Sequence, residues 1–560
     1  MKGMNYSNIT ALLRRIHQAT LRSEKSGIPI SELLGQDKEL RIKLQAQRLE
    51  DKQRRDFLKT VGGIGLGASL MPMGNLAFAA QGDVNGQGDT RVAIVGAGSG
   101  GLRTAHRLMQ YGWTSTVYEA NTRIGGRMYS NSDFFSDNRV VEWGGELIST
   151  EHTALRNLAH QLNLKLEDVN KLSVGDQETY LIDNQLYSEA NLMDEWVGGL
   201  YDIFKRAQMD APWQPLYNSE HTEAHLLFDH MNAIEWLESI GYSADNWVHK
   251  LLLSDLVAEY GLLEENSALN LIYLLAWNPH NSGGLPLAGT DERLHVVGGN
   301  DLIPHGMANE LPVDTIQTGR KLEAIVGDRD GPYTLVFDTG PDETCDKLVL
   351  ALPYGLIKNV DIDIRIINQF SPQKNQAIAQ ILHADNGKVQ MEFSDRHWDR
   401  VHTIDGEEIN QAARSYSNPD GFISTWEGEP GNPSTLGVLV NYNGGIEGKT
   451  LRKSRSGNDF FGVANVKDVD RVMPQIEQIW PGISSKYTGK ALVSNWWDNP
   501  FSKGAFVSPG VDTMTVWWGA QWETEGNIYF AGEACDEEVW SYMDGAIRSG
   551  ERVATEIAQS

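Results

Sequence analysis

The sequence is poor in cysteine and in positive charge. Its 560 residues hold only two cysteines, Cys345 and Cys535, and its formal net charge at pH 7 is −27. Two cysteines cannot build a disulfide framework or a cysteine zinc site, so we expect no metal centre and two free thiols, although one disulfide stays open. The negative charge disfavours nucleic acid and anionic membranes as partners.

The N-terminal region also lacks an apolar run long enough to cross a membrane. Residues 61–70 are mildly apolar, but they are too few and too rich in glycine. They follow the pair Arg54 and Arg55 and precede Ala-Phe-Ala at 77–79, a small-x-small cleavage site. This order is typical of a twin-arginine export signal. We therefore expect residues 54–80 to direct export to the periplasm or the medium.

The signal follows a long N-terminal extension, residues 1–53, for which the sequence suggests no function. A polar linker, residues 81–90, leads to the main body. Hydrophobic residues make up 41% of the chain and charged residues 22%, as in globular proteins, and the length favours more than one domain. No internal repeat follows residue 90.

The body opens with a glycine-rich turn between a strand and a helix. Residues 92–95 form a short apolar run of the kind found in a buried parallel strand. In the following Gly-x-Gly-x-x-Gly pattern, Gly96 permits a tight turn and Gly98 lets the backbone approach a pyrophosphate. Gly101 lets the next helix pack closely on the strand.

The residues after this turn complete a dinucleotide-binding unit. A helix is expected over residues 102–111, with its N-terminal amides pointing at the phosphates. A second strand, 115–119, ends on Glu119, where an acid can hold a ribose hydroxyl. A similar short strand near the other end of the chain finishes on Gly532 and Glu533. The two fragments predict one dinucleotide, FAD, bound by nearly the full length of the chain.

Further motifs resemble those of the flavin-containing amine oxidases, which include monoamine, polyamine and L-amino-acid oxidases. The resemblance covers roughly residues 90–560. It rests on Glu119 to Arg127, Glu142-Trp143-Gly144-Gly145, Val297-Gly298-Gly299, Leu348 to Pro353, and Phe530 to Ala546. It implies that Arg127 lies near the flavin and the pyrophosphate and that Glu533 holds the ribityl chain. It also implies cofactor contacts at Gly144, Val326 and Met543.

These motifs predict an α/β fold of two domains. The first is a Rossmann-like FAD-binding domain that is discontinuous in sequence, and the second is a substrate domain with a mixed sheet and helices. We expect residues 91–150, 293–357 and 490–560 to form the first domain. Residues 151–292, which include a helical insertion, and 358–489 form the second. Two strands of a small meander are expected at 320–326 and 333–337.

A lysine is the candidate catalytic cation. Lys388 lies in the alternating segment 387–393, which reads as a strand. A lysine that begins a strand is usually solvated, but buried lysines are rare. In the amine oxidases a lysine at this place holds a water on flavin N5 and assists reaction with O2, and the resemblance extends this role to Lys388.

Aromatic side chains are expected to guide the amine. The family's closing motif places one wall of an aromatic cage at Tyr542, beside Trp540, and Phe506 supplies the other wall. Aromatic residues are more often core than cage, but these come from motifs that meet at one cofactor. Monoamine oxidases attach FAD through a cysteine just before the second cage residue. Here that position is Ala505, so we expect FAD to be bound non-covalently.

The substrate is the least determined feature. Many L-amino-acid oxidases grip the substrate carboxylate with an arginine shortly after the paired glycines, but Glu146 and Leu147 stand here. A carboxylate can instead be held by Arg396, Arg400 or Arg414, among which the sequence does not choose. Neutral donors such as Trp540 and Tyr542 are a further alternative.

We expect an exported oxidase that converts L-amino acids to 2-oxo acids with ammonia and H2O2, by hydride transfer from Cα to flavin N5 and reoxidation by O2. A monoamine or polyamine oxidase is the main alternative. A flavin dehydrogenase and a flavoprotein without catalysis are weaker ones. The expected partners are a small amino acid or amine, O2 and the twin-arginine export machinery, with a homodimer left open.

The export signal gives a first testable prediction. Replacing Arg54 and Arg55 by lysine should retain the protein in the cytoplasm, because the export route recognises the arginine pair. Fractionation followed by N-terminal sequencing measures this, and the exported wild-type protein should begin after Ala79. An exported product that begins before Arg54 would contradict the cleavage prediction.

Overall fold

The computed structural model describes most of the body. The described residues are 86–172, 175, 177–261, 263–276, 292–404, 406–418, 422–451 and 460–560. The N-terminal extension 1–53, the export signal 54–80 and half of the linker 81–90 lie outside the described residues. No helix among the described residues has the length and hydropathy of a membrane span.

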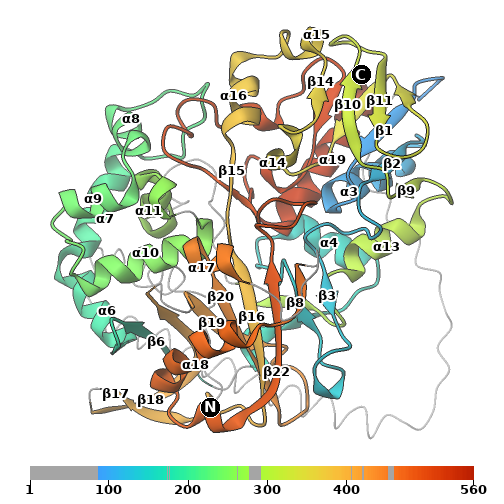
Figure 1. Cartoon of the computed structure of the whole chain (residues 1–560). Coiled ribbons are helices and arrows are strands. Elements are labelled where there is room, and N and C mark those ends of the chain that lie inside the picture. The colour runs from blue at the N-terminus through green and yellow to red at the C-terminus, as the bar shows by residue number, and fades with distance from the viewer. Residues whose placement is uncertain are drawn as a thin grey trace, which may run out of the picture. The chain divides into compact units, whose positions relative to one another are not determined.

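A parallel sheet of five strands forms the centre of the first domain (Figure 1). Its order is β24-β13-β1-β2-β9, and every neighbouring pair is parallel. The strands are β1 (Val92–Val95), β2 (Thr116–Glu119), β9 (Ile316–Thr318), β13 (Lys347–Leu350) and β24 (Ile528–Phe530). They come from the three segments expected for the FAD-binding domain, so distant parts of the chain lie side by side in one sheet.

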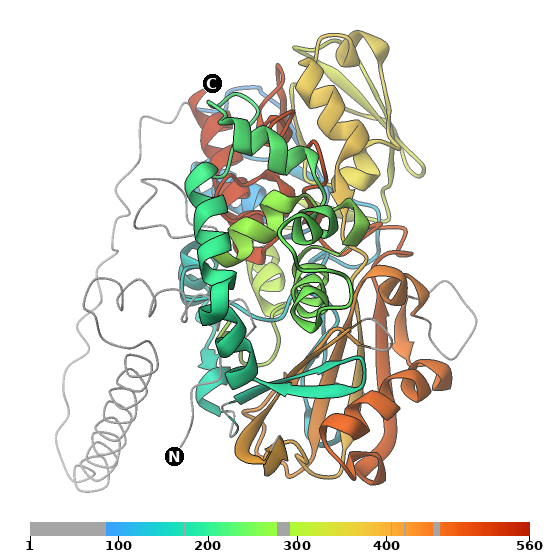
Figure 2. The same ribbon diagram turned by 90° about the vertical axis from the view of Figure 1, so that its left-hand side faces the viewer.

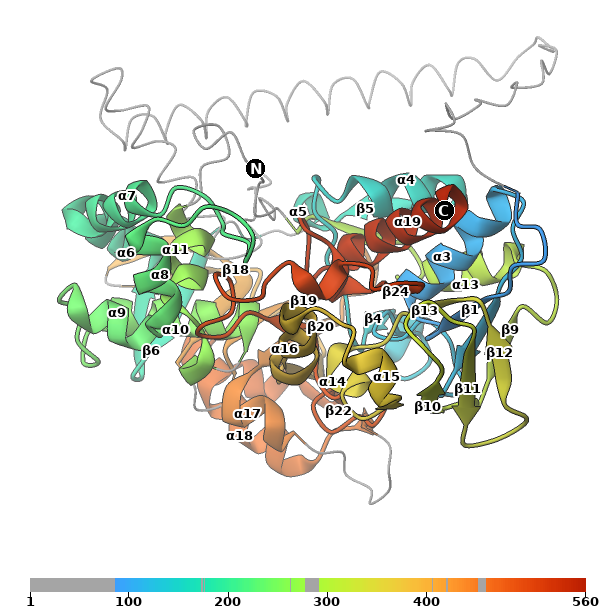
Figure 3. The same cartoon turned by 90° about the horizontal axis from the view of Figure 1, so that it is seen from above.

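Helices cover this sheet because their apolar faces need a buried surface. Helix α3 (Ser99–Gln110) follows β1, and α19 (Met543–Gln559) lies beside α3 (Figure 3). Helices α4 (Thr153–Gln161) and α13 (Leu302–Glu310) pack on the same group. Their shared core contains side chains from segments far apart in sequence: Ile94, Leu102, Leu155, Ile303, Val349, Ile547 and Ile557.

A second sheet of four strands consists of a meander, β10 to β12, and of β14, which pairs parallel with β10. Its order is β12-β11-β10-β14. The bounds are β10 (Leu322–Val326), β11 (Tyr333–Phe337), β12 (Glu343–Cys345) and β14 (Asp361–Ile362). The two expected meander strands, β10 and β11, are thus confirmed as an antiparallel pair. Helix α14 (Tyr354–Ile357) precedes β14, and helices α15 (Ile364–Ile367) and α16 (Pro372–Gln380) follow it.

The second domain is built on a nine-stranded mixed sheet. The order is β21-β22-β16-β20-β19-β18-β6-β7, with β17 paired to β18. Its strands are β6 (Gln177–Ile182), β7 (Gln185–Ser188), β16 (Gly387–Phe393), β17 (Val401–Ile404), β18 (Glu407–Ser417), β19 (Ser424–Gly428), β20 (Gly437–Asn443), β21 (Phe461–Val463) and β22 (Tyr487–Asn495). Strand β22 runs across the expected boundary at residue 490. Helices α17 (Gly445–Thr450) and α18 (Val466–Ile479) complete this part.

The helical insertion forms a layer of its own, drawn in green in Figure 2. Its helices are α6 (Glu189–Glu195), α7 (Tyr201–Asp210), α8 (Glu223–His230), α9 (Ala233–Ser239), α10 (Trp247–Tyr260) and α11 (Ala268–Ala276). Helix α10 packs on strands β6, β18 and β19, so this layer covers part of the nine-stranded sheet. The two-domain α/β fold predicted from the sequence is confirmed.

Short elements join these parts. They are β3 (Ser130–Asn131), β4 (Val141–Glu142), β5 (Leu166–Asp168), α5 (Val169–Leu172), β8 (Leu294–Val296), β15 (Leu382–His383) and β23 (Val507–Ser508). The two cysteines, Cys345 and Cys535, are buried free thiols, as expected. Burial raises the pKa of both to about 12.

Candidate active site

The glycine turn after β1 has room for a ligand at one position only. A Cβ on Gly96, whose φ is +109°, would lie 2.4 Å from the carbonyl oxygen of Ala351. A Cβ on Gly101 would lie 2.0 Å from the Gly96 carbonyl oxygen, so α3 and the turn are in backbone contact. A Cβ on Gly98 would meet nothing within 4 Å. The turn is therefore closed on the protein side and open at Gly98.

The N-terminus of α3 and Glu119 face this opening. Gly98 caps α3 without a side-chain hydrogen bond, and the first turn holds no acid, so the positive end of the helix is not neutralised. At the end of β2, Glu119 accepts hydrogen bonds from the amides of Ala97 and Asn121, both at 2.8 Å. Burial raises the pKa of Glu119, and its carboxylate oxygens have lone pairs left for ribose hydroxyls.

The end of β24 closes the same site. A Cβ on Gly100 would lie 2.8 Å from the amide nitrogen of Gly532, so the first and last motifs are in contact. Gly532 has a φ of +132° and open space at its own Cβ position. Next to it, the Glu533 carboxylate forms an ion pair of 2.9 Å with Arg127. The predicted pyrophosphate and ribityl residues are thus neighbours.

The paired glycines join this site to α19. A Cβ on Gly145 would lie 2.8 Å from the Met543 sulfur, and a Cβ on Gly144 would lie 2.1 Å from the Arg127 carbonyl oxygen. These residues form a cradle of backbone, with one acid at the ribose end and an Arg–Glu pair further along. Such a cradle fits FAD.

One predicted cofactor residue is not brought to this cradle. Val326 ends β10 in the meander, pairs with Thr334 and is 42% exposed. The backbone that meets the end of β2 lies earlier in the chain, where the amide of Arg320 donates to the Glu119 carbonyl oxygen at 2.8 Å. The sequence predicted one strand over residues 320–326. In the structure, Arg320 bonds the end of β2, and the strand itself, β10, pairs in the meander.

A hydrogen bond joins the two chain segments that carry the predicted cage aromatics. The Ser541 hydroxyl donates to the Val507 carbonyl oxygen at 2.6 Å, so Phe506 and Tyr542 each neighbour one end of this bond. Ser541 has a φ of +69°, a costly conformation for a residue with a side chain. Arg127 also donates to the Ala505 carbonyl oxygen at 2.9 Å, which ties the Phe506 segment to the cofactor cradle.

The aromatic wall continues into the helical layer. The Tyr542 hydroxyl lies 3.4 Å from a Glu259 carboxylate oxygen, and the Trp540 ring stacks on Tyr260 with ring centres 5.7 Å apart. The Trp540 indole nitrogen is buried and has no hydrogen-bond partner within the described chain. It is therefore a donor available to a bound molecule.

Lys388 of β16 is buried, as expected if it is a catalytic cation and not a solvated surface lysine. Its side chain is 5% exposed, and its ammonium donates to the Gly144 carbonyl oxygen at 2.8 Å and to the Glu142 carbonyl oxygen at 3.1 Å. A third bond, of 2.6 Å, goes to the Glu146 carboxylate. The interpretation of Lys388 as a solvated strand residue is thus wrong.

The sequence did not identify two residues of this cluster. Glu146 was noticed only because no arginine stands in its place, and Trp426 of β19 was not singled out. The Trp426 indole donates to Glu146 at 2.8 Å, and the Lys388 ammonium lies 5.6 Å from the Trp426 ring centre. Only the pairing of β16, β20 and β19 brings Trp426 here, since the spacing of single strands does not reveal which strands are neighbours.

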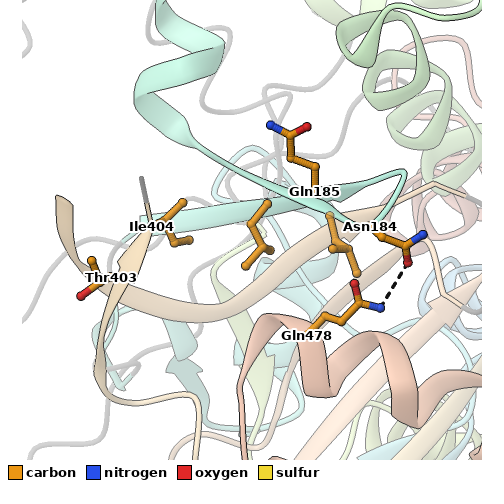
Figure 4. A pocket seen from close by; sticks show the side chains of 7 residues that line it. Asn184, Gln185, Thr403, Ile404 and Gln478 are labelled. Carbon is orange, nitrogen blue, oxygen red and sulfur yellow. Dashed lines mark hydrogen bonds between the residues drawn. The ribbon is translucent and has the colours of Figure 1, made fainter. Parts of the chain in front are cut away.

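A hollow elsewhere on the second domain does not belong to this site (Figure 4). It is lined by residues of the β6–β7 hairpin, β17 and α18: Leu181, Asn184, Gln185, Leu186, Thr403, Ile404 and Gln478. Gln478 donates to Asn184 across it at 3.2 Å. None of these side chains titrates near neutral pH, and none is a predicted site residue.

The chain matches known proteins along most of its length. A family model described as "Flavin containing amine oxidoreductase" matches residues 99–558. Among curated relatives, an L-amino-acid oxidase of Siganus canaliculatus is 24% identical over 486 residues, covering 83% of this chain and 85% of that protein. The flavin-containing amine oxidase B of Bos taurus is 25% identical over 507 residues, with coverage of 83% and 85%.

Other relatives differ in length and in name. Lysine-specific histone demethylase 1 homolog 1 of Arabidopsis thaliana is 25% identical over 487 residues, and the match spans 83% of this chain but about half, 52%, of that protein. Among solved structures, cyclohexylamine oxidase from Brevibacterium oxydans superposes with a TM-score of 0.67 at 18% identity. It covers 84% of this chain and 99% of its own. At that identity the likeness shows the fold.

The glycine turn yields a prediction that separates folding from cofactor binding. Gly98→Ala should change the free energy of unfolding of the apoprotein by less than about 1 kcal/mol, because nothing occupies the Cβ position. It should weaken FAD binding at least about tenfold, measured by flavin fluorescence titration. The matched variant Gly101→Ala should destabilise the apoprotein by about 2 kcal/mol, since its Cβ overlaps backbone. Equal loss of stability in both would refute the assignment of the open position.

The absence of an attachment cysteine yields a second prediction. With Ala505 beside Phe506, FAD should be released by acid precipitation, leaving the yellow colour in the supernatant. The absorbance of the supernatant and of the washed pellet measures this. Flavin that stays with the denatured protein would show a covalent bond at another residue.

Proposed function

The chain belongs to the flavin-containing amine oxidoreductase family, and we propose that it is an oxidase of L-amino acids. FAD dependence and amine oxidase activity follow from the family. The choice of amino acids over simple amines is the proposal, because the relatives include both kinds of oxidase.

A buried arginine carries this proposal. Of the three arginines that the sequence left open, Arg396 donates to Glu427 and to the Asn432 carbonyl oxygen, and the side chain of Arg400 is 49% exposed. The side chain of Arg414 is 10% exposed, and its nearest acid, Glu292, lies 3.9 Å away. A guanidinium offers five donors, so Arg414 has capacity for a substrate carboxylate.

Strand register supports the position of Arg414. Lys388, Tyr442 and Ser424 lie opposite one another across β16, β20 and β19, and Ser424 pairs with Tyr416 of β18. Alternate residues of a strand share a face, so Arg414, two residues before Tyr416, lies on the Lys388 face. Its guanidinium is 5.2 Å from the ring centre of Trp426, which Lys388 also approaches.

In this proposal the residues divide the work of binding and orientation. Arg414 pairs with the substrate carboxylate through two hydrogen bonds. The Trp540 indole N–H can donate a hydrogen bond to a further acceptor atom of the substrate. Phe506 and Tyr542 hold the neutral amine so that the substrate Cα–H points at the cofactor. The cradle of Gly98, Glu119 and the Arg127–Glu533 pair would hold FAD, which would supply the hydride acceptor and, with O2 as oxidant, yield H2O2. Water then hydrolyses the released imine to a 2-oxo acid and ammonia.

We also propose that the enzyme acts after export. The twin-arginine pattern and the Ala-Phe-Ala site at 77–79 support this, and that route carries folded proteins with their cofactors. H2O2 would then form outside the cytoplasm. A homodimer is compatible with the proposal and is not required by it.

Carboxylates around the substrate face favour a second candidate, a monoamine or polyamine oxidase. Burial raises the pKa of Tyr442 well above its usual value, and the neighbouring charges of Glu259, Glu292 and Glu146 raise it further. The Tyr542 hydroxyl also lies 3.4 Å from Glu259. Acids near the amine-binding aromatics attract a cationic substrate that has no carboxylate.

The test compares amino acids with their decarboxylated forms. We expect H2O2 release from L-leucine, L-phenylalanine and L-methionine, little from isoamylamine, phenethylamine and putrescine, and none from D-phenylalanine. A site built to pair a carboxylate leaves its own groups unpaired when the amine binds. Faster turnover of the amines would favour the second candidate.

Arg414 gives the matched mutational test. Arg414→Met should lower kcat/KM for L-leucine about 10²-fold, the scale of a lost charge-assisted pair, and should change isoamylamine turnover little. Arg400→Gln, at an exposed site, is the control and should alter neither. An equal loss for both substrates in Arg414→Met would remove the carboxylate role.

A further inference from the structure

Glu146 and Lys388 form a buried, fully hydrogen-bonded ion pair. The Lys388 side chain is 5% exposed and the Glu146 side chain 10% exposed, with 2.6 Å between Nζ and Oε2. An ammonium has three hydrogens, and the three acceptors are Glu146 and the carbonyl oxygens of Glu142 and Gly144. The other oxygen of Glu146 accepts from the Trp426 indole at 2.8 Å. The position and the orientation of the ammonium are therefore set by the protein.

The pair adjoins the residues that hold the cofactor. Lys388 bonds the Gly144 carbonyl oxygen, and the next amide, of Gly145, donates to the Arg127 carbonyl oxygen at 3.1 Å. Arg127 in turn pairs with Glu533. One backbone hydrogen bond thus connects the ion pair with the Arg–Glu pair of the FAD cradle.

Other charges near the pair have their own partners. The Glu142 carboxylate accepts from His295 at 2.9 Å, from the Ser130 hydroxyl and from the Asn300 amide. Burial lowers the pKa of His295, but its hydrogen bonds to Glu142 and Glu167 outweigh this and raise the pKa to about 10, so its positive charge faces both carboxylates. Arg414 approaches Trp426 and has Glu292 as its nearest acid. Glu146 is the carboxylate in direct contact with the Lys388 ammonium.

We propose that Glu146 is a positioning residue that fixes the Lys388 ammonium and cancels its net charge beside the flavin. A lone buried cation at this place would favour the reduced flavin, which carries more negative charge, and would be costly to bury. The Lys388–Glu146 pair presents a dipole instead, so it holds the reduction potential of bound FAD below the value that Lys388 alone would impose. The inference rests on the FAD site and holds for amino-acid and amine substrates alike.

The proposal also explains a departure in the sequence. The position after Gly144-Gly145 holds an acid here because Lys388 needs a partner of opposite charge. The lack of an arginine at Glu146 therefore carries no information about how a substrate carboxylate is bound.

The test is the midpoint potential of FAD in the holoenzyme, measured by equilibration with a reference dye. Glu146→Gln keeps the shape and removes the negative charge, so the potential should become more positive. Lys388→Met leaves Glu146 without its cation, so the potential should become more negative. The double variant restores a neutral site and should return close to the wild-type value.

A buried ion pair on the opposite face of the same sheet is the matched control. Glu427 neighbours Trp426 in sequence and pairs with Arg396. Glu427→Gln should lower the melting temperature and leave the potential unchanged. If Glu146→Gln behaves in the same way, the Lys388–Glu146 pair is structural and the proposal fails.

A conservative variant keeps the proposal testable if Glu146→Gln does not load FAD. Glu146→Asp retains the negative charge but holds it further from Lys388. The FAD potential in this variant should therefore lie between that of the wild type and the more positive value expected for Glu146→Gln. A potential equal to wild type in Glu146→Asp, together with no shift in Lys388→Met, would overturn the proposal. Neither result bears on Arg414, so failure here and failure of the proposed substrate are distinguishable.

Discussion

Backbone contact at three glycines is the constraint on which the remaining structure depends. Gly100, at the start of α3, packs against the amide of Gly532, and a Cβ on Gly550 of α19 would lie 2.5 Å from the Gly100 carbonyl oxygen. No side chain fits between these segments, so the first βα turn and the last strand are joined directly. This contact holds α19 beside α3 and places Tyr542, which precedes α19, at the cofactor cradle.

The nine-stranded sheet supplies what the parallel sheet cannot. The parallel sheet presents glycines and helix amides, which suit phosphate groups, whereas β16, β19 and β18 present Lys388, Trp426 and Arg414 on one face. Two cations approach one indole because the strands pair in register. The helical layer adds Glu259 next to Tyr542. In our proposal, substrate selection depends on side chains of the nine-stranded sheet, whereas the cofactor cradle depends largely on backbone.

Charge in the site is organised in pairs. Glu533 pairs with Arg127, Glu142 with His295, and Glu146 with Lys388. Burial makes an unpaired charge costly, and each of these three acids lies beside a cation. Arg414 differs, because its closest acid is 3.9 Å away. All three hydrogens of the Lys388 ammonium are bonded. Arg414 contacts Glu292, Tyr416 and the Trp426 ring, and its guanidinium has five donors in all, so the two residues have separate roles in our proposals.

The sequence alone determined the cofactor and the fold class, because both depend on local backbone requirements. Gly96, Gly98 and Gly101 must follow a buried strand for the turn to form, and Val92–Val95 and Gly387–Phe393 are the strands that alternation and apolar content predict. The meander strands were predictable for the same reason. Each of these features lies within about ten residues of chain.

Tertiary structure decided what depends on which distant segments touch. The partner of Lys388, the place of Val326 in the meander and the difference among Arg396, Arg400 and Arg414 all follow from sheet register and loop paths between domains. An isolated strand shows which side chains share its face but not what lies opposite them. For this reason the sequence showed only that Glu146 stands where many L-amino-acid oxidases have an arginine. The fold shows that Glu146 pairs with the buried Lys388.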